Sequence, residues 1–444
     1  MLWKLFTEII ILYVITTNIS LGSSYFNHKN YECILASKTP YRCVANYDDS
    51  ELENSDCEEK KIWLILRHGT RYPGKKYIPR MIDELPRLQH IILKNYEDHA
   101  INLSADVAAF FKQWKLQITQ RDVMKLAPEG ENEMIDLGER YQARFPSLMP
   151  EMYSNQTYKF RFTSTQRTEE SARHFAVGLF GWRNSKNVLY PEPVYRDRVI
   201  RFYKACPRWR KEVDKNFNST LEKIKFLNST IVRDMLNNIK NRIGCNINYE
   251  TAHLMYIMCA FETAWNHSTV SPWCLVFSLN DFKVFEYAED LELYWTDGYG
   301  YSLTYEQACP ALKDMFDFFK SKDGVKTTAY FTHSGTILKL LALLGVAKDT
   351  HPLMHNSLVL DKEDKRVWRT SMIDAFASNM AFVLYDCASY GPSILFMLQE
   401  RPLYLPGCPI GIPCPISIMK EIYPDLDEEC QFDVMCHVKH ENKN

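Results

Sequence analysis

The segment that decides the fold reads Lys61-Ile62-Trp63-Leu64-Ile65-Leu66 and continues directly as Arg67-His68-Gly69-Thr70-Arg71. A short continuous apolar run that stops at a polar turn is typical of a strand buried on both faces of a sheet. We therefore expect a central strand over 61–66. Because ligands bind beyond the carboxyl ends of strands in open α/β sheets, the turn over 67–71 lies where a ligand would bind.

The same arrangement recurs late in the chain. The apolar run from Thr327 to Thr332 stops at His333, and helix-forming residues follow over 337–346. We expect a second buried strand that leads through a loop into a helix. Residues 381–385 and 394–398 predict two further strands near the C-terminal end.

Helical patterns fill the chain between the early and the late strands. They cover 128–145, 168–180 and, as several helices, about 220–320. The sequence shows no repeat, low-complexity tract or Pro/Gly-rich linker that would separate independent units. It therefore predicts an α/β fold with a mixed, mainly parallel sheet flanked by helices and with an inserted helical domain. The expected division is a discontinuous core over 23–200 and 325–405, a helical insertion over 201–324 and a cysteine-containing tail over 406–444.

The beginning of the chain resembles a signal peptide over 1–22, with Lys4 before an apolar run and small residues at its end. The run from Leu5 to Val14 is too short to span a bilayer, for which about 20 apolar residues are needed. We expect a secreted protein or one in the lumen of the secretory pathway. An uncleaved leader that anchors the protein in the membrane is the alternative.

The cysteines fit an oxidising compartment. There are 13, without a Cys-x-x-Cys pair, which favours disulfides over a zinc site or a redox motif. The odd count leaves at least one thiol outside the disulfides of the chain. Four cysteines near the C-terminus are candidates to staple the tail, namely Cys408, Cys414, Cys430 and Cys436. Five Asn-x-Ser/Thr sequons follow the expected leader and are consistent with a secreted glycoprotein, at Asn102, Asn155, Asn218, Asn228 and Asn266.

The balance of charge limits the classes of partner. Lys and Arg number 53 and Asp and Glu number 55, so no overall field attracts nucleic acid or a membrane surface. An anionic ligand must therefore be attracted by a local cluster. The sequence predicts a small phosphorylated substrate, no nucleic acid, no stable membrane span after removal of the leader, no cofactor and no metal, and it carries no signal for an oligomeric state.

His68 and His333 both follow apolar strands and are expected to converge on one site. A neutral imidazole can attack phosphorus when one ring nitrogen donates a hydrogen bond and the other keeps its lone pair. Arg67 and Arg71 offer planar, permanently charged donors that match phosphoryl oxygens. Gly69 would let the backbone approach the phosphate.

A third arginine is expected at the start of a helix. Arg167 follows the segment 163–166, so its guanidinium would stand with free backbone amides at an anion-attracting helix terminus. Singly, such an arginine is usually solvated and a histidine such as His333 is usually structural. Their joint occurrence after apolar strands favours a phosphoryl-binding site.

Arg67-His68-Gly69-Thr70-Arg71-Tyr72-Pro73 resembles the signature of the histidine acid phosphatase branch of the histidine phosphatase superfamily. The similarity extends from about Cys57 to about Leu405 and is greatest to the multiple inositol polyphosphate phosphatases. Further matching segments are Ser271-Pro272-Trp273-Cys274, Glu286-Tyr287, Asp290-Leu291, Tyr294-Trp295, Gly298-Tyr299-Gly300-Tyr301, Ala377-Ser378-Asn379, Met397-Leu398 and Glu400.

The resemblance implies a role for each motif residue. His68 would be the nucleophile, His333 would hydrogen-bond the phosphoryl group, and that group would be clamped by Arg67, Arg71 and Arg167. Lys76 would hold a neighbouring phosphate of a polyphosphorylated ring, with Thr70, Lys75 and Arg80 as further candidates for substrate binding. On charge alone the lysines could equally belong to an ordinary solvated basic loop.

The chain departs from the family pattern at Gly335. The family follows its second histidine with a small residue and then an acid, which protonates the leaving alcohol. Gly335 cannot donate a proton, and general acid catalysis is typically worth about 10²- to 10⁴-fold. A carboxylate from another segment is the favoured substitute, with Glu129, Glu169 and Glu170 as candidates. A protonated neighbouring phosphate or a water is the second possibility.

Two functions follow from these observations. The first is a secreted phosphomonoesterase that hydrolyses inositol polyphosphates such as phytate, or bisphosphoglycerate, through a phosphohistidine and without a metal. The second is a weakened or inactive secreted binder of phosphorylated ligands, because the acid is replaced by Gly335. The intact His68 favours the enzyme, since a binder does not need a nucleophile.

Overall fold

A computed structural model describes residues 31–48, 56–360, 364–423 and 430–438. The expected signal peptide over 1–22 lies outside these residues. Within them, none of the helices has both the length and the apolar character needed to cross a bilayer.

One mixed sheet organises the chain, in the order β2-β3-β1-β4-β5-β6 with β7 also paired to β5. The expected central strand is confirmed, since β1 lies between β3 and β4. The two expected late strands are confirmed as β4 and β5. The strand bounds are β1 Cys57–Arg67, β2 Tyr158–Phe162, β3 Thr327–Thr332, β4 Asn379–Cys387, β5 Gly391–Leu398, β6 Arg401–Pro402 and β7 Cys414–Pro415.

Parallel pairing is confined to β2, β3 and β1, and the pairs from β1–β4 onward are antiparallel. The mixed sheet is thus confirmed, while its parallel part is smaller than expected. The reason is local, because only three residues separate β4 from β5 and a parallel pair needs a long crossover. Strand β2, which the sequence did not predict, is a short edge strand beside β3.

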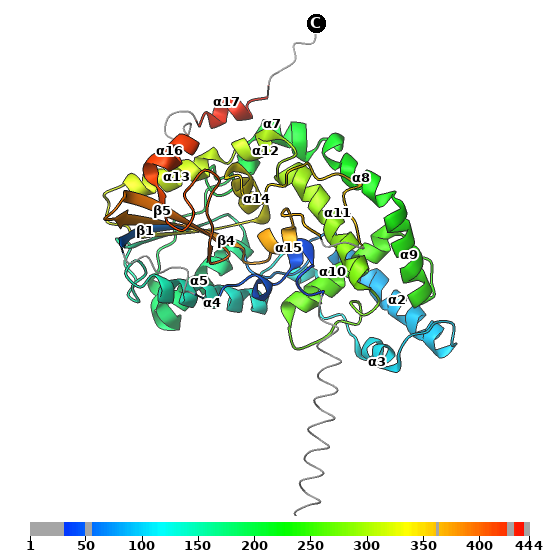
Figure 1. Cartoon of the computed structure of the whole chain (residues 1–444). Coiled ribbons are helices and arrows are strands. Elements are labelled where there is room, and N and C mark those ends of the chain that lie inside the picture. Colours follow the sequence, from blue (N-terminus) through cyan, green and yellow to red (C-terminus); the bar gives the residue numbers. More distant parts are fainter. Residues whose placement is uncertain (1–30, 49–55, 361–363, 424–429, 439–444) are drawn as a thin grey trace, which may run out of the picture.

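Helices cover both faces of the sheet, α4 and α5 on one face and α13 and α14 on the other (Figure 1). Side chains of β1 alternate between two apolar cores. Ile62, Leu64 and Leu66 pack on the α4–α5 side, whereas Trp63 and Ile65 pack on the opposite side. The bounds of these helices are α4 Pro128–Arg144, α5 Gln166–Asn184, α13 Cys309–Lys320 and α14 Ser334–Leu343, as the periodicity over 128–145, 168–180 and 337–346 predicted within a few residues.

The remaining helices form the other half of the molecule (Figure 1). Helix α2 lies in this half and packs against α10, although the sequence assigned its residues to the core segment 23–200. The apolar core beside Trp63 continues into α9, α10 and α11, so this half shares a core with one face of the sheet. The domain division stays a prediction. The helices of this half and the connecting turns are α2 Ile78–Glu97, α3 Ala105–Gln113, α6 Phe202–Ala205, α7 Pro207–Trp209, α8 Leu221–Leu227, α9 Thr230–Ile243, α10 Tyr249–Trp265, α11 Leu279–Asp297, α12 Ser302–Glu306 and α15 Thr370–Ile373.

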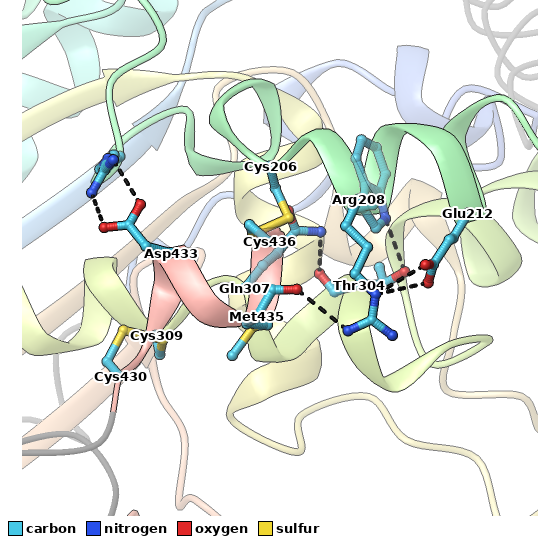
Figure 2. Close-up of a disulfide and its surroundings, with 12 residues drawn as sticks. Cys206, Arg208, Glu212, Thr304, Gln307, Cys309, Cys430, Asp433, Met435 and Cys436 are labelled. Atoms are coloured by element: carbon cyan, nitrogen blue, oxygen red, sulfur yellow. Dashed lines mark hydrogen bonds and ion pairs between the residues drawn. A yellow bond between two sulfur atoms is a disulfide. The ribbon is translucent and has the colours of Figure 1, made fainter. Parts of the chain in front are cut away.

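Disulfides hold the C-terminal tail, which contains α16 Ile416–Ile422 and α17 Phe432–Cys436. Cys206–Cys436 joins α17 to the turn between α6 and α7, and Cys309–Cys430 joins the residue before the N-cap of α17 to the start of α13 (Figure 2). Arg208 adds a hydrogen bond to the carbonyl of Met435. The two disulfides confirm that the late cysteines staple the tail. The other four disulfides are Cys33–Cys43, Cys57–Cys387, Cys259–Cys274 and Cys408–Cys414.

The unpaired cysteine and the sequons are the two features that the sequence associated with secretion. The odd thiol is Cys245, the one cysteine among the 13 without a disulfide partner. All five sequon asparagines are exposed, as a glycosylation acceptor must be. Glycosylation itself stays a prediction.

Candidate active site

His68 and His333 lie side by side at the carboxyl ends of β1 and β3. The parallel register pairs Arg67 with Thr332, so both strands end at the same level. The backbone amide of His68 donates to the carbonyl of Thr332 at 3.0 Å. The two imidazole rings are 5.7 Å apart between centroids and inclined by 67°. The sheet thus brings together the two histidines that the sequence placed after its apolar runs.

The ring of His68 is held in one tautomer. Its Nδ1 is 2.9 Å from the carbonyl oxygen of Gly69, and because a carbonyl can only accept, Nδ1 carries the proton. The Nε2 atom then keeps its lone pair. Burial lowers the pKa of His68 well below its usual value, and the charges of Arg167, Arg67 and Arg71 lower it further. The imidazole is therefore neutral and can act as a nucleophile at physiological pH.

The second histidine is engaged by the protein through both ring nitrogens. Its Nδ1 accepts from Nη2 of Arg167 at 3.1 Å, and its Nε2 lies 2.8 Å from the hydroxyl of Thr163. An arginine can only donate, so Nε2 of His333 carries the proton and donates to Thr163. In this arrangement His333 orients Arg167, rather than presenting a donor to the phosphoryl group as the resemblance implied.

Arg67 and Arg71 are anchored by backbone carbonyls. Arg67 donates to the carbonyl oxygens of Ser37 and Asp374, and Arg71 donates to that of Tyr72 at 2.8 Å. These positive charges repel one another. Burial, followed by the charges of Arg167 and Arg67, lowers the pKa of Arg71 to about 9. An anion bound among these groups would relieve that repulsion.

Arg201 adds a fourth guanidinium that the sequence analysis missed. Its charge is second only to burial in lowering the pKa of Arg167 to about 10. It follows Ile200, whose carbonyl accepts from the hydroxyl of Thr336 at 2.9 Å and also from Thr332. Residues 200 and 336 are far apart in the sequence, so their contact leaves no local signal. This is why the sequence did not point to Arg201.

The four arginines share one feature that matters for ligand binding. The Nε atom of each is buried, and it has no hydrogen-bond partner among the described residues: Arg67, Arg71, Arg167 and Arg201. Buried donors are normally paired, so such a group of free N–H donors is suited to an anion. The arrangement can accept the oxygens of a phosphoryl group beside the lone pair of His68.

Helix α4 fixes the loop that carries His68. Glu133 accepts from the backbone amide of Thr70 at 2.6 Å and from its hydroxyl at 2.9 Å. A Cβ atom on Gly69 would overlap the carbonyl oxygen of Gly130. Gly69 is thus required by close packing of two backbones, in addition to any approach to phosphate. Thr70 is fully buried and its hydroxyl donates to Glu133, so Thr70 positions this loop, and its contact with substrate stays a prediction.

The remaining basic candidates lie in different settings. Lys75 and Lys76 are exposed, and Nζ of Lys76 is 5.8 Å from the ring centroid of Tyr77. Tyr77 is near Arg71, whose charge lowers the pKa of the phenol against the larger effect of burial. Lys76 thus contacts a residue on which the charge of Arg71 acts, and the binding of substrate by Lys75 and Lys76 stays a prediction. Arg80 donates to Glu84 at 2.6 Å and is committed to that ion pair.

The three candidate acids are not brought to the histidines by any contact between described residues. Glu169 accepts from Arg173 at 2.8 Å, and Glu170 lies 4.0 Å from the ring of His174, both within α5. Glu129 stands in the first turn of α4, and its charge contributes to raising the pKa of Glu133.

Comparisons with known proteins agree with this geometry. The model of the histidine phosphatase superfamily, branch 2, matches residues 60–399. The chain is 32% identical over 409 residues to multiple inositol polyphosphate phosphatase 1 of Drosophila melanogaster, covering 89% of this chain and 86% of that protein. The fold resembles the phytase from D. castellii, with a TM-score of 0.73, 16% identity and coverage of 92% and 88%. It also resembles the Bifidobacterium longum multiple inositol polyphosphate phosphatase in complex with inositol hexasulfate, with a TM-score of 0.67, 15% identity and coverage of 88% and 98%.

Proposed function

This chain belongs to the histidine phosphatase superfamily, branch 2, and on that premise we propose that it hydrolyses inositol polyphosphates through a phosphohistidine on His68. Its Drosophila relative is named for that class of substrate, and the cluster of cations suits a polyanion. In this reaction the four guanidinium groups bind the phosphoryl oxygens, and His68 accepts the phosphoryl group.

The reaction has two displacement steps. In the first, the Nε2 lone pair of His68 attacks phosphorus, the P–O ester bond breaks, and the alcohol leaves after taking a proton. In the second, water attacks phosphorus, the P–N bond breaks, and the lone pair returns to His68 as inorganic phosphate leaves. Charge on the equatorial oxygens is stabilised by the four guanidinium groups, whose buried Nε donors have no partner among the described residues: Arg67, Arg71, Arg167 and Arg201.

The observation that carries the proposal is a neutral imidazole inside a group of permanent cations. Binding an anion would need only the cations. The hydrogen bond from Nδ1 of His68 to the Gly69 carbonyl has a further consequence, since it keeps Nε2 unprotonated and available for attack. This favours an enzyme over a binder of phosphorylated ligands.

We also propose that the protein is exported to the extracellular space or to a secretory compartment. Six disulfides support this, because such bonds persist in oxidising compartments. The five exposed sequons are consistent with it.

The test is release of inorganic phosphate from inositol hexakisphosphate by the purified protein. His68→Ala should abolish release, and His90→Ala, which changes an exposed histidine on α2, should leave it unchanged. Rapid quenching with labelled substrate should trap acid-labile, base-stable phosphate on the parent chain. Binding of the substrate without release would decide for the binder, and turnover without a trapped phosphoenzyme would contradict the mechanism.

A further inference from the structure

Gly335 has a carboxylate directly beside it. A Cβ atom on Gly335 would lie 2.9 Å from Oδ1 of Asp297 and 3.4 Å from Cζ of Tyr203. The Asp297 carboxylate therefore fills the space into which a side chain at position 335 would point. Resting on the proposed function, we infer that Asp297 is the group that protonates the leaving oxygen, in place of an acid at position 335.

Asp297 reaches this place because α11 ends there. Ser278 and Asp281 form a reciprocal capping box that fixes the start of α11, and Asp297 is its last residue. No motif connects that position to the His333 segment in sequence. The packing of α11 against α14 makes the connection.

The surroundings of Asp297 tie it to the phosphoryl-binding groups. The ring of Tyr203, which would touch the added Cβ, lies in the field of both Arg201 and Arg167, whose charges partly offset the effect of burial on its pKa. The charge of Asp297 also contributes to raising the pKa of Asp374, whose carboxylate lies 3.5 Å from Nη1 of Arg67. Asp297 thus lies beside the His333–Gly335 segment, and its charge acts on Tyr203 and Asp374, which adjoin the cation cluster.

Lys339 holds the Asp297 carboxylate in place. It lies one helical turn after Gly335, it is fully buried, and its ammonium donates to Oδ1 of Asp297. Its Nζ is also 4.3 Å from the ring centroid of Trp209 and 4.9 Å from that of Tyr203. The other carboxylate oxygen accepts from the hydroxyl of Thr296 at 2.8 Å. A buried cation fixed against two rings would stabilise the carboxylate that remains after the proton has left.

Exposure separates Asp297 from the other nearby acid. Asp374 accepts from the hydroxyl of Ser334 and touches Arg67, and its side chain is 0% exposed. The Asp297 side chain is 18% exposed. A general acid must come within hydrogen-bond reach of the leaving oxygen, which departs toward solvent, so the more exposed Asp297 is the better placed of the two.

The protons balance over the two steps. The Asp297 carboxyl gives its proton to the ester oxygen as the P–O bond breaks, which releases a neutral alcohol and leaves a carboxylate beside Lys339. The same carboxylate then takes a proton from the water that attacks the phosphohistidine. The product is inorganic phosphate, and the Asp297 carboxyl has regained the proton that it gave up in the first step.

The first test compares leaving groups. Asp297→Asn should lower kcat for inositol hexakisphosphate by about 10²- to 10⁴-fold, because an alkoxide is a poor leaving group, and kcat for p-nitrophenyl phosphate by less than about tenfold. Asp214→Asn is the matched control, since Asp214 is exposed and also acts on Lys339 by its charge. It should leave both rates unchanged. An equal fall on both substrates, or no fall on either, would overturn the assignment.

The second test restores an acid at position 335. In Asp297→Gly the space beside Gly335 is free, so adding Gly335→Glu should recover turnover of inositol hexakisphosphate at least tenfold over Asp297→Gly alone. No recovery in a folded double variant would contradict the assignment. Failure of the proposed function would look different, because the parent protein would then release phosphate from neither substrate.

Discussion

The two sides of the candidate site are built in different ways. The nucleophile side consists of the Arg67–Arg71 loop and the starts of α4 and α5. The leaving-group side consists of Tyr203, Asp297, Gly335 and Lys339, which come from α6, α11 and α14. On the first side, most groups stand within one short segment, whereas on the second each key contact joins distant segments. Local sequence can therefore reveal the first side and not the second.

The two sides also differ in what fixes them. At Gly69 and Gly130 two backbones touch, so any added side-chain atom overlaps main-chain atoms that cannot move aside. At Gly335 the nearest atom is the end of the Asp297 side chain, held by Lys339. A glycine whose backbone touches another backbone cannot be substituted, but a contact between two side chains can be replaced by a different pair of side chains. This explains how a proton donor can move to another segment while the nucleophile loop keeps its motif.

The largest expected effect concerns the disulfide behind the leaving-group side. Cys206 follows the segment that carries Arg201 and Tyr203, and its bond to Cys436 closes 230 residues. Cys206→Ser with Cys436→Ser should lower the free energy of unfolding by about 5 kcal/mol, because the unfolded chain regains the entropy of a long loop. It should also slow turnover of inositol hexakisphosphate more than that of p-nitrophenyl phosphate. Urea unfolding and the ratio of the two rates check this.

The matched control is the disulfide Cys408–Cys414, which closes only six residues. Its removal by two Ser substitutions should cost about 2 kcal/mol and leave the ratio of rates unchanged. Equal losses of stability in the two double variants would show that the long disulfide does not hold the leaving-group side.

The same division between local and long-range contacts decides which parts of the molecule the sequence could predict. The runs before His68 and His333 predicted β1, β3 and their convergence, because a buried strand has an apolar pattern of its own. Strand β2 was missed, since its five residues alternate between buried aromatic and more exposed basic side chains and contain no continuous apolar run. Arg201 and Asp297 were missed because long-range contacts bring them to the site.

A smaller effect is expected on the nucleophile side, at Glu133. Burial raises the pKa of Glu133 from 4.5 to about 7 in the folded protein, against the hydrogen bonds from Thr70. The folded state then binds a proton more tightly than the unfolded state between about pH 4.5 and pH 7. The contribution of Glu133 to the free energy of unfolding is therefore fully present below about pH 4.5. It falls by about 3 kcal/mol as pH rises through 7.

Glu133→Gln should remove this part of the pH dependence, because an amide does not titrate. The unfolding free energy of the parent should fall relative to that of the variant between pH 5 and pH 8, as measured by urea unfolding. Other buried acids contribute equally to both proteins, so the difference isolates Glu133. Parallel curves would mean that Glu133 is ionised in the folded protein throughout this range.

The predicted acids illustrate why position in sequence is a poor guide to a proton donor. Glu169 and Glu170 are close to Arg167 along the chain, but a helix turns successive side chains in different directions. Both therefore meet partners on α5 itself, Arg173 and His174. Asp297 is far from Arg167 in sequence and lies beside Gly335 in the fold.

The smallest expected effect concerns Lys339, which positions Asp297 without being the acid. Lys339→Met keeps an apolar chain against Trp209 and Tyr203 and leaves Asp297 with some solvation, so the fold should persist. Turnover of inositol hexakisphosphate should fall about tenfold relative to p-nitrophenyl phosphate, corresponding to about 1.4 kcal/mol. In the background of Asp297→Asn the same substitution should change that ratio little, because the acid it positions is gone. A ratio that falls equally in both backgrounds would mean that Lys339 acts on the leaving group independently of Asp297.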